Sequence, residues 1–359
     1  MNKSLKTKKF FVGVSGGVDS SVTAAILKEN GYQVTGVFIK AWHPTFLPCN
    51  WRGEMRDAMR ICAKLKIPFL LCDLEKEYKH EVIDYLISEY KNGRTPNPDV
   101  FCNKEIKFGH FLDWSINQGA DFVATGHYAR TQRTGTEVKM LAGLDIDKDQ
   151  TYFLWTLSQE KLQKILFPIG EFVKSKVRKL AKQYNLHTHN KKDSQGLCFV
   201  GHVDMKLFLK RFIKTESGKV LDNKGNEIGR HEGSELYTFG QRHGFKINLN
   251  SNHKENYYVV DKNLNENTIT VTEKVPKDYN DTNEIELIDV SFTRDIFYNK
   301  NNISMKIKPR YRSVNYNANL VKTDSKYRLK LIDDIEKIAP GQSVVFYIED
   351  ECIGGGIVK

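Results

Sequence analysis

The stretch that decides the fold is "FFVGVSGGVDSSVTAAIL", residues 10–27. An apolar run enters a Ser-Gly-Gly turn, and a helical pattern follows it directly. Gly16 and Gly17 allow the backbone to approach a ligand closely. Asp19 and Ser20 stand at the expected start of the helix, where free N–H groups attract anions. The stretch therefore predicts a phosphate-binding turn between a strand and a helix.

The turn differs from two common phosphate-binding motifs. A Walker loop carries a Lys after its last Gly, whereas Val18 and Asp19 follow the glycines here, and the G-x-G-x-x-G fingerprint is also absent. "SGGVDSS", residues 15–21, instead resembles the PP-loop of the ATP pyrophosphatase superfamily. That resemblance implies that ATP is cut between its α- and β-phosphates and that AMP is transferred to a carbonyl oxygen.

Strand-like and helical segments alternate over the first 130 residues. The apolar runs "KFFVGV", "YQVTGVFIK", "IPFLLCDL" and "DFVATGHYA" are separated by helical patterns. Continuous apolar strands joined by helices predict an α/β domain with a doubly wound parallel sheet, whose ligands lie beyond the carboxyl ends of the strands. We expect helical structure to continue through residues 151–166 and 173–186.

The pattern of apolar and polar residues changes after about residue 205. Short alternating strands with frequent turns replace the helices, which is typical of a small β-barrel or sandwich. We predict three domains: a PP-loop ATP-binding catalytic domain at 1–204, a small β-rich central domain at 205–279 and a C-terminal β-barrel that contacts tRNA at 280–359.

The composition is that of a basic globular protein. Among 359 residues, 55 are Lys or Arg and 44 are Asp or Glu, which gives a formal charge of +11. This surplus suits a nucleic acid partner, although charge alone is equally consistent with a generic basic protein. No apolar run approaches the ~20 residues of a membrane span, and we read the basic start as leading into the first strand. We therefore expect a cytoplasmic protein with no membrane contact.

Six cysteines are too few for a disulfide scaffold in a chain of this length, and none forms a C-x-x-C pair. Cys198 lies in a polar turn, where a thiol is a better nucleophile than one in a strand. Cys102 follows Asp99 by three residues, so both side chains can face one site on a helical turn. Lys104 is close in sequence and is expected to favour a thiolate. The remaining cysteines are expected to be small buried hydrophobes, namely Cys49, Cys62, Cys72 and Cys352.

Several longer motifs follow the glycine turn in a fixed order. They are "NPDVFCNKEIKF" (97–108), "TGHYAR" (125–130), "KDQTYFL" (148–154), "SQGLCFVG" (194–201), "YTFGQRHG" (237–244) and "PRYR" (309–312). Together they resemble the tRNA-specific 2-thiouridylase (MnmA) family over essentially the whole chain. The resemblance implies a tRNA sulfurtransferase: ATP adenylates the C2 oxygen of the wobble uridine, pyrophosphate leaves, and persulfide sulfur replaces the oxygen to give 2-thiouridine and AMP.

The resemblance also implies roles for particular residues. Cys198 carries the persulfide, Cys102 is the partner nucleophile, and Asp99 is a general acid or base. Sulfur is delivered from the persulfide directly or as hydrosulfide, and the two cysteines are left as a disulfide that must be reduced. The residues that touch the target base are Asn97, Pro98 and Asp99.

Binding residues follow in the same way. The resemblance assigns ATP to the turn, to Ile39 just past the second strand and to a glycine further on: Gly13, Val14, Ser15, Gly16, Gly17, Val18, Asp19, Ser20, Ile39 and Gly126. It assigns tRNA contacts to Lys148, Asp149, Gln150, Arg310 and Tyr311. Mg²⁺ is expected with ATP and pyrophosphate rather than in a site made of protein ligands. The implied partners are tRNAs for Lys, Glu and Gln and a sulfur donor, either a relay protein or a cysteine desulfurase.

Two other classes of protein stay open. Another PP-loop ligase or amidotransferase-type synthetase would share the adenylating turn but would not need Cys102, Cys198 and a basic β domain. An RNA-binding protein with a relic nucleotide site would tolerate loss of Ser15, Asp19 and both cysteines. The joint presence of these residues favours the thiolating enzyme.

Overall fold

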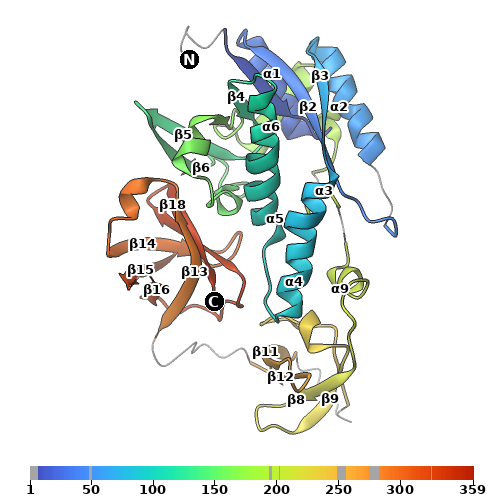
Figure 1. The fold of residues 1–359 in the computed structure, drawn as a ribbon, viewed down its shortest axis with the longest axis vertical. Helices are drawn as coiled ribbons and strands as arrows, with labels where there is room; N and C mark the ends of the chain where they lie inside the picture. Colours follow the sequence, from blue (N-terminus) through green and yellow to red (C-terminus); the bar gives the residue numbers. More distant parts are fainter. Residues whose placement is uncertain are drawn as a thin grey trace.

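The computed structural model describes residues 7–47, 51–193, 196–201, 203–248, 256–274, 283–324 and 326–359. The strands of these residues form three β-sheets, two of five strands and one of eight. Figure 1 shows them in separate regions of an elongated molecule, with helical columns running from the first sheet towards the central one.

The first sheet is parallel throughout and has the order β3-β2-β1-β4-β7. Its strands are β1 (Lys9–Gly13), β2 (Gln33–Ala41), β3 (Phe69–Leu74), β4 (Phe122–Ala124) and β7 (Ile165–Leu166). Alternate residues of β1 point to opposite faces. Phe10 and Val12 pack under one helical layer, and Phe11 packs under the other. The predicted doubly wound α/β domain is confirmed.

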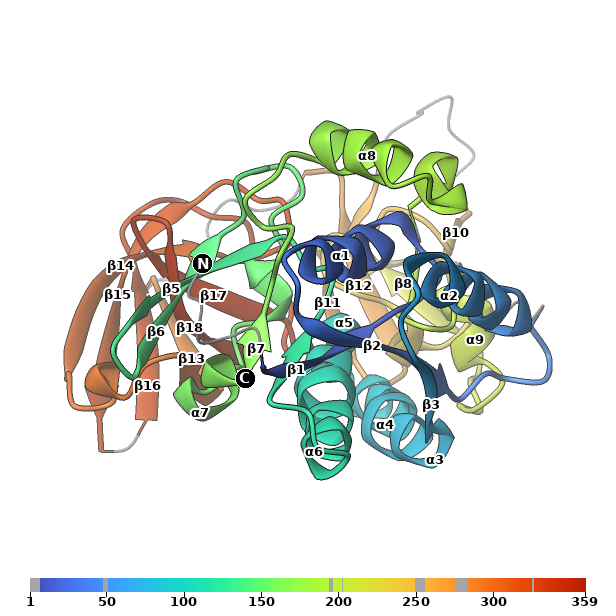
Figure 2. The ribbon, with the colours of Figure 1, turned by 90° about the horizontal axis from the view of Figure 1, so that it is seen from above.

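Helices cover both faces of this sheet, as Figure 2 shows. One layer holds α1 (Val18–Glu29), α2 (Trp51–Leu65) and α8 (Lys174–Gln183). The other layer consists of two composite helices that each contain a π-helical segment, in which hydrogen bonds span five residues. The first is α3 (Glu75–Tyr78), η2 (Lys79–Asp84) and α4 (Tyr85–Lys91), and the second is α5 (Pro98–Phe101), η3 (Cys102–His110) and α6 (Phe111–Asn117).

The expected helix over 151–166 is wrong. The segment forms a 3-10 turn η4 (Thr151–Phe153), a short helix α7 (Gln159–Gln163) and strand β7, which completes the parallel sheet. Ser158 begins α7 because its side chain accepts a hydrogen bond from the Lys161 N–H. Between the two helical turns, Trp155 is buried against Gly355 of the C-terminal sheet, and this tertiary contact overrides the helical pattern.

The C-terminal sheet closes into a six-stranded barrel, because β13 pairs with both β16 and β18. Its strands are β13 (Glu284–Phe292), β14 (Asn302–Lys308), β15 (Tyr316–Thr323), β16 (Lys326–Leu331), β17 (Ser343–Ile348) and β18 (Glu351–Val358), with the turn η7 (Asp295–Phe297). The predicted C-terminal β-barrel is confirmed. A hairpin of β5 (Ala129–Thr134) and β6 (Glu137–Ala142) extends the sheet, since Leu141 pairs with Glu351.

The central region is a mixed sheet of order β10-β9-β8-β12-β11, in which β8 and β12 are parallel. It contains β8 (Gly218–Leu221), β9 (Glu227–His231), η6 (Ser234–Leu236), β10 (Lys246–Ile247), β11 (Tyr258–Asn263) and β12 (Thr268–Thr272). The turn η5 (His187–Asn190) and α9 (Met205–Leu209) precede it. The predicted boundary at 279/280 lies outside the described residues. In the described part of the chain, every helix is too short or too polar to cross a membrane.

Thr95 lies where the three regions meet. Its N–H donates to the carbonyl oxygen of Pro340 over 2.8 Å, and its own carbonyl accepts from the Gln342 side chain over 2.7 Å. The Thr95 hydroxyl lies 2.9 Å from that of Thr238 in the central region. The segment that leads into α5 is thus fixed by both accessory domains.

Candidate active site

The glycine turn lies beyond the carboxyl end of β1, where ligands of such sheets bind. Gly16 adopts φ +75°, and a Cβ there would lie 2.6 Å from the carbonyl oxygen of Glu54, so glycine is required. Ser20 holds the turn by accepting a hydrogen bond from the Ser15 N–H over 3.2 Å. Gly17 caps α1 without a side chain, which leaves the first N–H groups of the helix for an anion.

Gly126 packs directly against this turn. A Cβ on Gly126 would lie 2.8 Å from the Ser20 nitrogen and 2.9 Å from the carbonyl carbon of Asp19. The structure therefore brings Gly126 together with residues 13–20, as the sequence predicts for a shared nucleotide site. Ile39 lies within β2 rather than just past it, and its side chain is buried in the core.

The carboxylate of Asp19 is held by two side chains from later in the chain. Both of its oxygens accept from Lys174 over 2.8 Å, and one also accepts from the Tyr128 hydroxyl over 2.9 Å. Lys174 also pairs with Asp193 over 2.7 Å. Although burial acts to raise it, hydrogen bonds from Lys174 and Lys148 lower the pKa of Asp193 to about 2.

A second lysine ties the same later segment to the turn. Lys191 donates to the carbonyl oxygen of Gly16 over 3.0 Å and to Asp57 over 2.8 Å. Lys174 and Lys191 thus place two ammonium groups at a turn built for phosphate. Both precede Cys198 in the chain, so the segment that carries this cysteine is attached to the phosphate turn.

The thiols of Cys102 and Cys198 form the second part of the site. Their Sγ atoms are 3.2 Å apart, with the Cys102 thiol donating. Cys102 is fully buried at the start of η3, whereas Cys198 is partly exposed. Tyr78 donates from its hydroxyl to the Cys198 carbonyl over 2.5 Å, and Asp99 accepts from the Cys198 N–H over 3.3 Å. The structure therefore brings the three predicted catalytic residues together.

The environment separates the proton affinities of these groups. Burial raises the pKa of the Cys102 thiol well above its ordinary value. The hydrogen bond from Cys102 is the main cause that lowers the pKa of Cys198. Burial also raises the pKa of Asp99, against the charge of Lys107 and the N–H of Cys198. Cys198 is thus the better thiolate, and Asp99 is able to hold a proton at a pH where an exposed aspartate could not.

The lysine beside the thiols is Lys107, and the expectation for Lys104 is wrong. Lys104 pairs with Glu105 over 2.8 Å and is 46% exposed. Lys107 instead lies near both thiols and Asp99, and these acidic groups raise its pKa against the effect of burial. Five residues separate Cys102 from Lys107. That separation is one turn of a π-helix but well over one turn of an α-helix, so only the π-helix places both on one side.

The segment after β4 joins the two parts of the site. Gly126 contacts the phosphate turn, and His127 follows it in the chain. The Nε2 atom of His127 lies 3.5 Å from the Lys107 ammonium, and its Nδ1 atom lies 2.7 Å from the Thr125 hydroxyl. One short segment therefore touches the phosphate turn and the lysine at the thiols.

Asn97 and Pro98 begin the helix that presents Asp99. The Asn97 side chain accepts from the N–H groups of Asp99 and Val100, and Pro98 occupies the first helical position, which suits both residue types. Asn97, Pro98 and Asp99 are all partly exposed. The residues predicted to touch the target base thus lie beside the thiols, on a rigid helix start.

The residues predicted to contact tRNA come together from two domains. Tyr311 packs on Phe153 with ring centroids 4.5 Å apart, and Lys308 of the barrel pairs with Asp149 over 3.2 Å. Asp149 itself is buried, and Gln150 accepts from the N–H of Tyr128 over 2.9 Å. On the barrel side of this junction, the exposed Arg310 lies 3.4 Å from Glu336.

The other described cysteines take no part in the site. Cys62, Cys72 and Cys352 are buried in cores, and burial raises the pKa of Cys62 to about 11 and that of Cys72 to about 12. Cys49 lies outside the described residues. Among the described residues, no three His, Cys, Asp or Glu side chains are grouped so that they could hold a metal ion.

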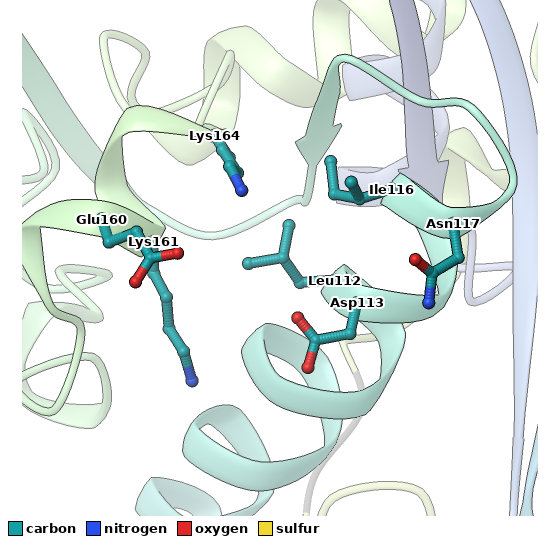
Figure 3. A pocket seen from close by; sticks show the side chains of 7 residues that line it. All are labelled: Leu112, Asp113, Ile116, Asn117, Glu160, Lys161 and Lys164. Carbon is teal, nitrogen blue, oxygen red and sulfur yellow. The ribbon is translucent and has the colours of Figure 1, made fainter.

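A shallow hollow of about 480 Å³ lies away from these residues, between α6 and α7. Figure 3 shows its mixed lining of Leu112, Asp113, Ile116, Asn117, Glu160, Lys161 and Lys164. None of the predicted site residues lines it. Its acidic and basic side chains are those of an ordinary solvated groove.

Four charged residues of the site were missed from the sequence: Lys107, Lys174, Lys191 and Asp193. Lys107 stands in a quoted motif, but helical spacing favours Lys104 unless the π-helix is known. Lys174 begins a helix in a basic stretch, and no feature of the sequence distinguishes it from the neighbouring lysines. Lys191 and Asp193 lie shortly before the Cys198 motif, and this proximity is the one signal by which the sequence could have identified them.

Most of the chain matches the models of known families. Residues 8–202 match "tRNA methyl transferase HUP domain", residues 206–273 match "tRNA methyl transferase PRC-barrel domain", and residues 282–358 match "Aminomethyltransferase beta-barrel domain". Among solved structures, the U34-tRNA thiolase NcsA from Methanococcus maripaludis shares 19% identity at a TM-score of 0.37, covering 55% of this chain and 64% of that chain.

Curated relatives are more similar. The tRNA-specific 2-thiouridylase MnmA of Bacillus pumilus is 42% identical over 362 residues, which cover 100% of this chain and 96% of that protein. The enzyme of the same name from Listeria monocytogenes serotype 4a is 43% identical over 350 residues, which cover 97% and 93%. Given this identity over nearly the full length of both proteins, the chain belongs to the tRNA-specific 2-thiouridylase MnmA family.

Proposed function

We propose that this protein is an ATP-dependent tRNA sulfurtransferase that converts the wobble uridine of tRNA to 2-thiouridine. The observation that carries the proposal is the contact between the Cys102 and Cys198 thiols, beside Asp99 and linked through residues 125–128 to the phosphate turn. Two of the matched family descriptions name methyl transfer. Paired thiols beside an adenylating turn instead suit activation of an oxygen followed by sulfur transfer.

In the first step, the phosphate turn binds ATP and the C2 oxygen of the uridine attacks the α-phosphorus. The bond to pyrophosphate breaks, and the oxygen becomes part of an AMP leaving group. The N–H groups at the start of α1 would stabilise the phosphates, as would the ammonium groups of Lys174 and Lys191. Mg²⁺ would be held mainly by phosphate oxygens, and Asp19 is the carboxylate within the turn that could reach it.

In the second step, the Cys198 persulfide attacks C2 through its outer sulfur, and AMP leaves with the oxygen. The Cys102 sulfur then bonds to the Cys198 sulfur, so the transferred sulfur departs on the uridine with its electron pair. The Cys102 proton is lost, and we assign its removal to Asp99, which lies beside the cysteine pair. Alternatively, Cys102 attacks the persulfide first and releases hydrosulfide. In both routes the two cysteines end as a disulfide, which a two-electron reductant must reopen.

We propose the division of labour that the sequence predicts. Residues 1–204 perform the chemistry, 205–279 form a central connecting domain, and 280–359 contact tRNA through Arg310 and Tyr311. Lys148 and Gln150 would meet tRNA at the same junction, whereas the predicted contact of Asp149 would be indirect, since this residue is buried and pairs with Lys308. The substrates would be tRNAs for Lys, Glu and Gln, and the sulfur would come from a relay protein or a cysteine desulfurase. Because tRNA and ATP meet in the cytoplasm, we place the reaction there.

A reconstituted assay tests the proposal. Protein, ATP, Mg²⁺, a cysteine desulfurase with cysteine as the persulfide donor, a thiol reductant and unmodified tRNA are incubated, and nucleosides from digested tRNA are analysed by mass spectrometry. The expected product is 2-thiouridine, formed only with ATP and accompanied by AMP and pyrophosphate. Release of AMP without sulfur in the tRNA would indicate another PP-loop ligase. Binding of tRNA without any ATP turnover would indicate an RNA-binding protein with a relic site.

A further inference from the structure

Lys107 occupies a position that the residue roles described so far do not explain. It lies on η3 one π-helical turn after Cys102, and its positive charge lowers the pKa of the Cys198 thiol. The same ammonium is 3.5 Å from the Nε2 atom of His127 and 5.8 Å from the ring centre of Phe199, the residue after Cys198. A cation is thus held among buried groups at the reacting sulfur atoms.

The groups around Lys107 come from three parts of the fold. Asp99 and Cys102 lie on its own composite helix, Cys198 lies on the segment after α8, and His127 follows β4. Tyr78, which ends α3, instead contacts the Cys198 carbonyl. Asp99, Cys102 and Cys198 each become negative on losing a proton, and the charge of Lys107 lowers the pKa of all three. One cation therefore acts on all three of these acidic groups.

His127 is neutral and orients this cation. Burial, reinforced by the charge of Lys107, lowers the pKa of His127 well below its ordinary value. An ammonium group can only donate, so the Nε2 atom must accept from Lys107 and the proton must sit on Nδ1. The Nδ1 atom is then able to donate to the Thr125 hydroxyl over 2.7 Å. This chain of contacts ties Lys107 to the segment after β4.

We propose that Lys107 is a catalytic residue of sulfur transfer, whose ammonium holds the Cys198 sulfur as an anion, first as thiolate and then as persulfide. The proposal rests on the proposed thiolation activity. As a thiolate, Cys198 attacks the outer sulfur of a donor persulfide; the donor's S–S bond breaks and the donor thiolate leaves. No electrons are gained or lost overall, because one S–S bond replaces another.

The same charge serves the later step. The outer sulfur must be anionic to attack C2, and a fixed ammonium beside Cys198 lowers the energy of that anion in a buried site. When Cys102 attacks Cys198, negative charge passes to the departing sulfur while the ammonium stays in place. A lysine is suited to this task because its compact charge keeps three donors available on a flexible stem.

The experiment measures the nucleophilicity of Cys198 without any substrate. Reduced protein is alkylated with iodoacetamide across pH 5–10, and peptide mass spectrometry gives the rate at Cys198. Lys107→Met should raise the pH midpoint of alkylation and slow the rate at pH 7 by about tenfold, since one pKa unit is a tenfold change in thiolate. Lys107→Arg should stay close to wild type because it keeps the charge.

Lys104→Met is the matched control, because Lys104 lies on the same helix but is exposed and pairs with Glu105. It should alkylate as wild type does. Thiolation of tRNA should fall in Lys107→Met, while release of pyrophosphate with tRNA and ATP should persist. This division between the two steps would not result from a general loss of structure.

Wild-type alkylation of Cys198 in the folded Lys107→Met variant would overturn the proposal. If that variant does not fold, the wild-type protein still decides the question: a Cys198 midpoint at or above about 8.5, the ordinary cysteine value, overturns it. Failure of the proposed function would look different. In that case the wild-type enzyme would make no 2-thiouridine, and Lys107 would have no role in sulfur transfer. Lys107→Met would nevertheless still shift the pH midpoint of Cys198 alkylation.

Discussion

The Sγ atoms of Cys102 and Cys198 lie 3.2 Å apart, although 96 residues separate the two cysteines in the sequence. A disulfide has an S–S distance of about 2.05 Å, so only a small movement is needed to form the bond. The two thiols belong to different kinds of structure: Cys102 lies on a helix, and Cys198 lies on an irregular segment. The partly exposed thiol on the irregular segment is the one that a sulfur donor can reach.

Cys198→Ser should abolish 2-thiouridine formation and leave adenylation of tRNA intact, because the hydroxyl cannot carry a persulfide while the phosphate turn is unchanged. Cys102→Ser should also lose catalytic turnover. Both variants are assayed for 2-thiouridine and for pyrophosphate release. Cys62→Ala is the control, since this thiol is buried away from the site. Sulfur transfer by Cys198→Ser would contradict the persulfide role, and normal turnover by Cys102→Ser would show that Cys102 is structural.

Asp19→Ala should lower the rate of pyrophosphate release by at least tenfold. The change removes a carboxylate of the phosphate turn and releases Lys174, which it holds over 2.8 Å. Asp121→Ala is the matched control, because this aspartate pairs with Lys8 at the opposite end of the parallel sheet. Pyrophosphate is measured by a coupled assay with saturating tRNA. Equal rates in the two variants would place the ATP site elsewhere.

Gly126→Ala should weaken ATP binding, because the new Cβ would lie under 3.0 Å from backbone atoms of Asp19 and Ser20 and would push the phosphate turn aside. Gly135→Asn is the control: its φ of +60° suits asparagine, and the hairpin end has open space. Binding of a non-hydrolysable ATP analogue is measured by calorimetry. An unchanged affinity in Gly126→Ala would mean that this contact does not shape the site.

Asp99→Asn should lose thiolation yet stabilise the folded protein at neutral pH. Burial raises the pKa of Asp99, so its contribution to stability is full below the unfolded value of about 3.9 and is lost as pH rises through the folded value. The loss is about 1.4 kcal/mol for each pH unit between the two pKa values. The gain in melting temperature should therefore be larger at pH 8 than at pH 5. A melting temperature of Asp99→Asn below that of the wild type at pH 8 would contradict this prediction.

Binding of tRNA should weaken steeply with salt, because phosphate contacts release counterions. Arg310→Ala should reduce the slope of log affinity against log salt by about one. Arg60→Ala is the control, since this exposed arginine lies on α2 of the first domain. Filter binding at several salt concentrations gives both slopes. A flat salt response would count against the basic surface as the tRNA contact.

The sequence predicted the parallel sheet well because its strands are short apolar runs that begin and end at clear turns, as around Gly16. It predicted less where geometry depends on distant contacts. β7 was missed because two residues carry no pattern of their own, and Trp155 interrupts a helical pattern only by meeting the barrel. Lys107 was missed because we judged spacing by the period of an α-helix, and no residue pattern within 102–110 indicates a π-helix.

Thr95 gives the arrangement of domains a practical consequence. Its backbone N–H and carbonyl are both paired with residues from the C-terminal region, and it stands two residues before Asn97. A fragment that ends after the first domain would leave both groups without these partners, next to the helix start that presents Asp99. Separating the domains would therefore destabilise the start of the helix that carries Asp99. The accessory domains thus support the geometry of the site in addition to their proposed contacts with RNA.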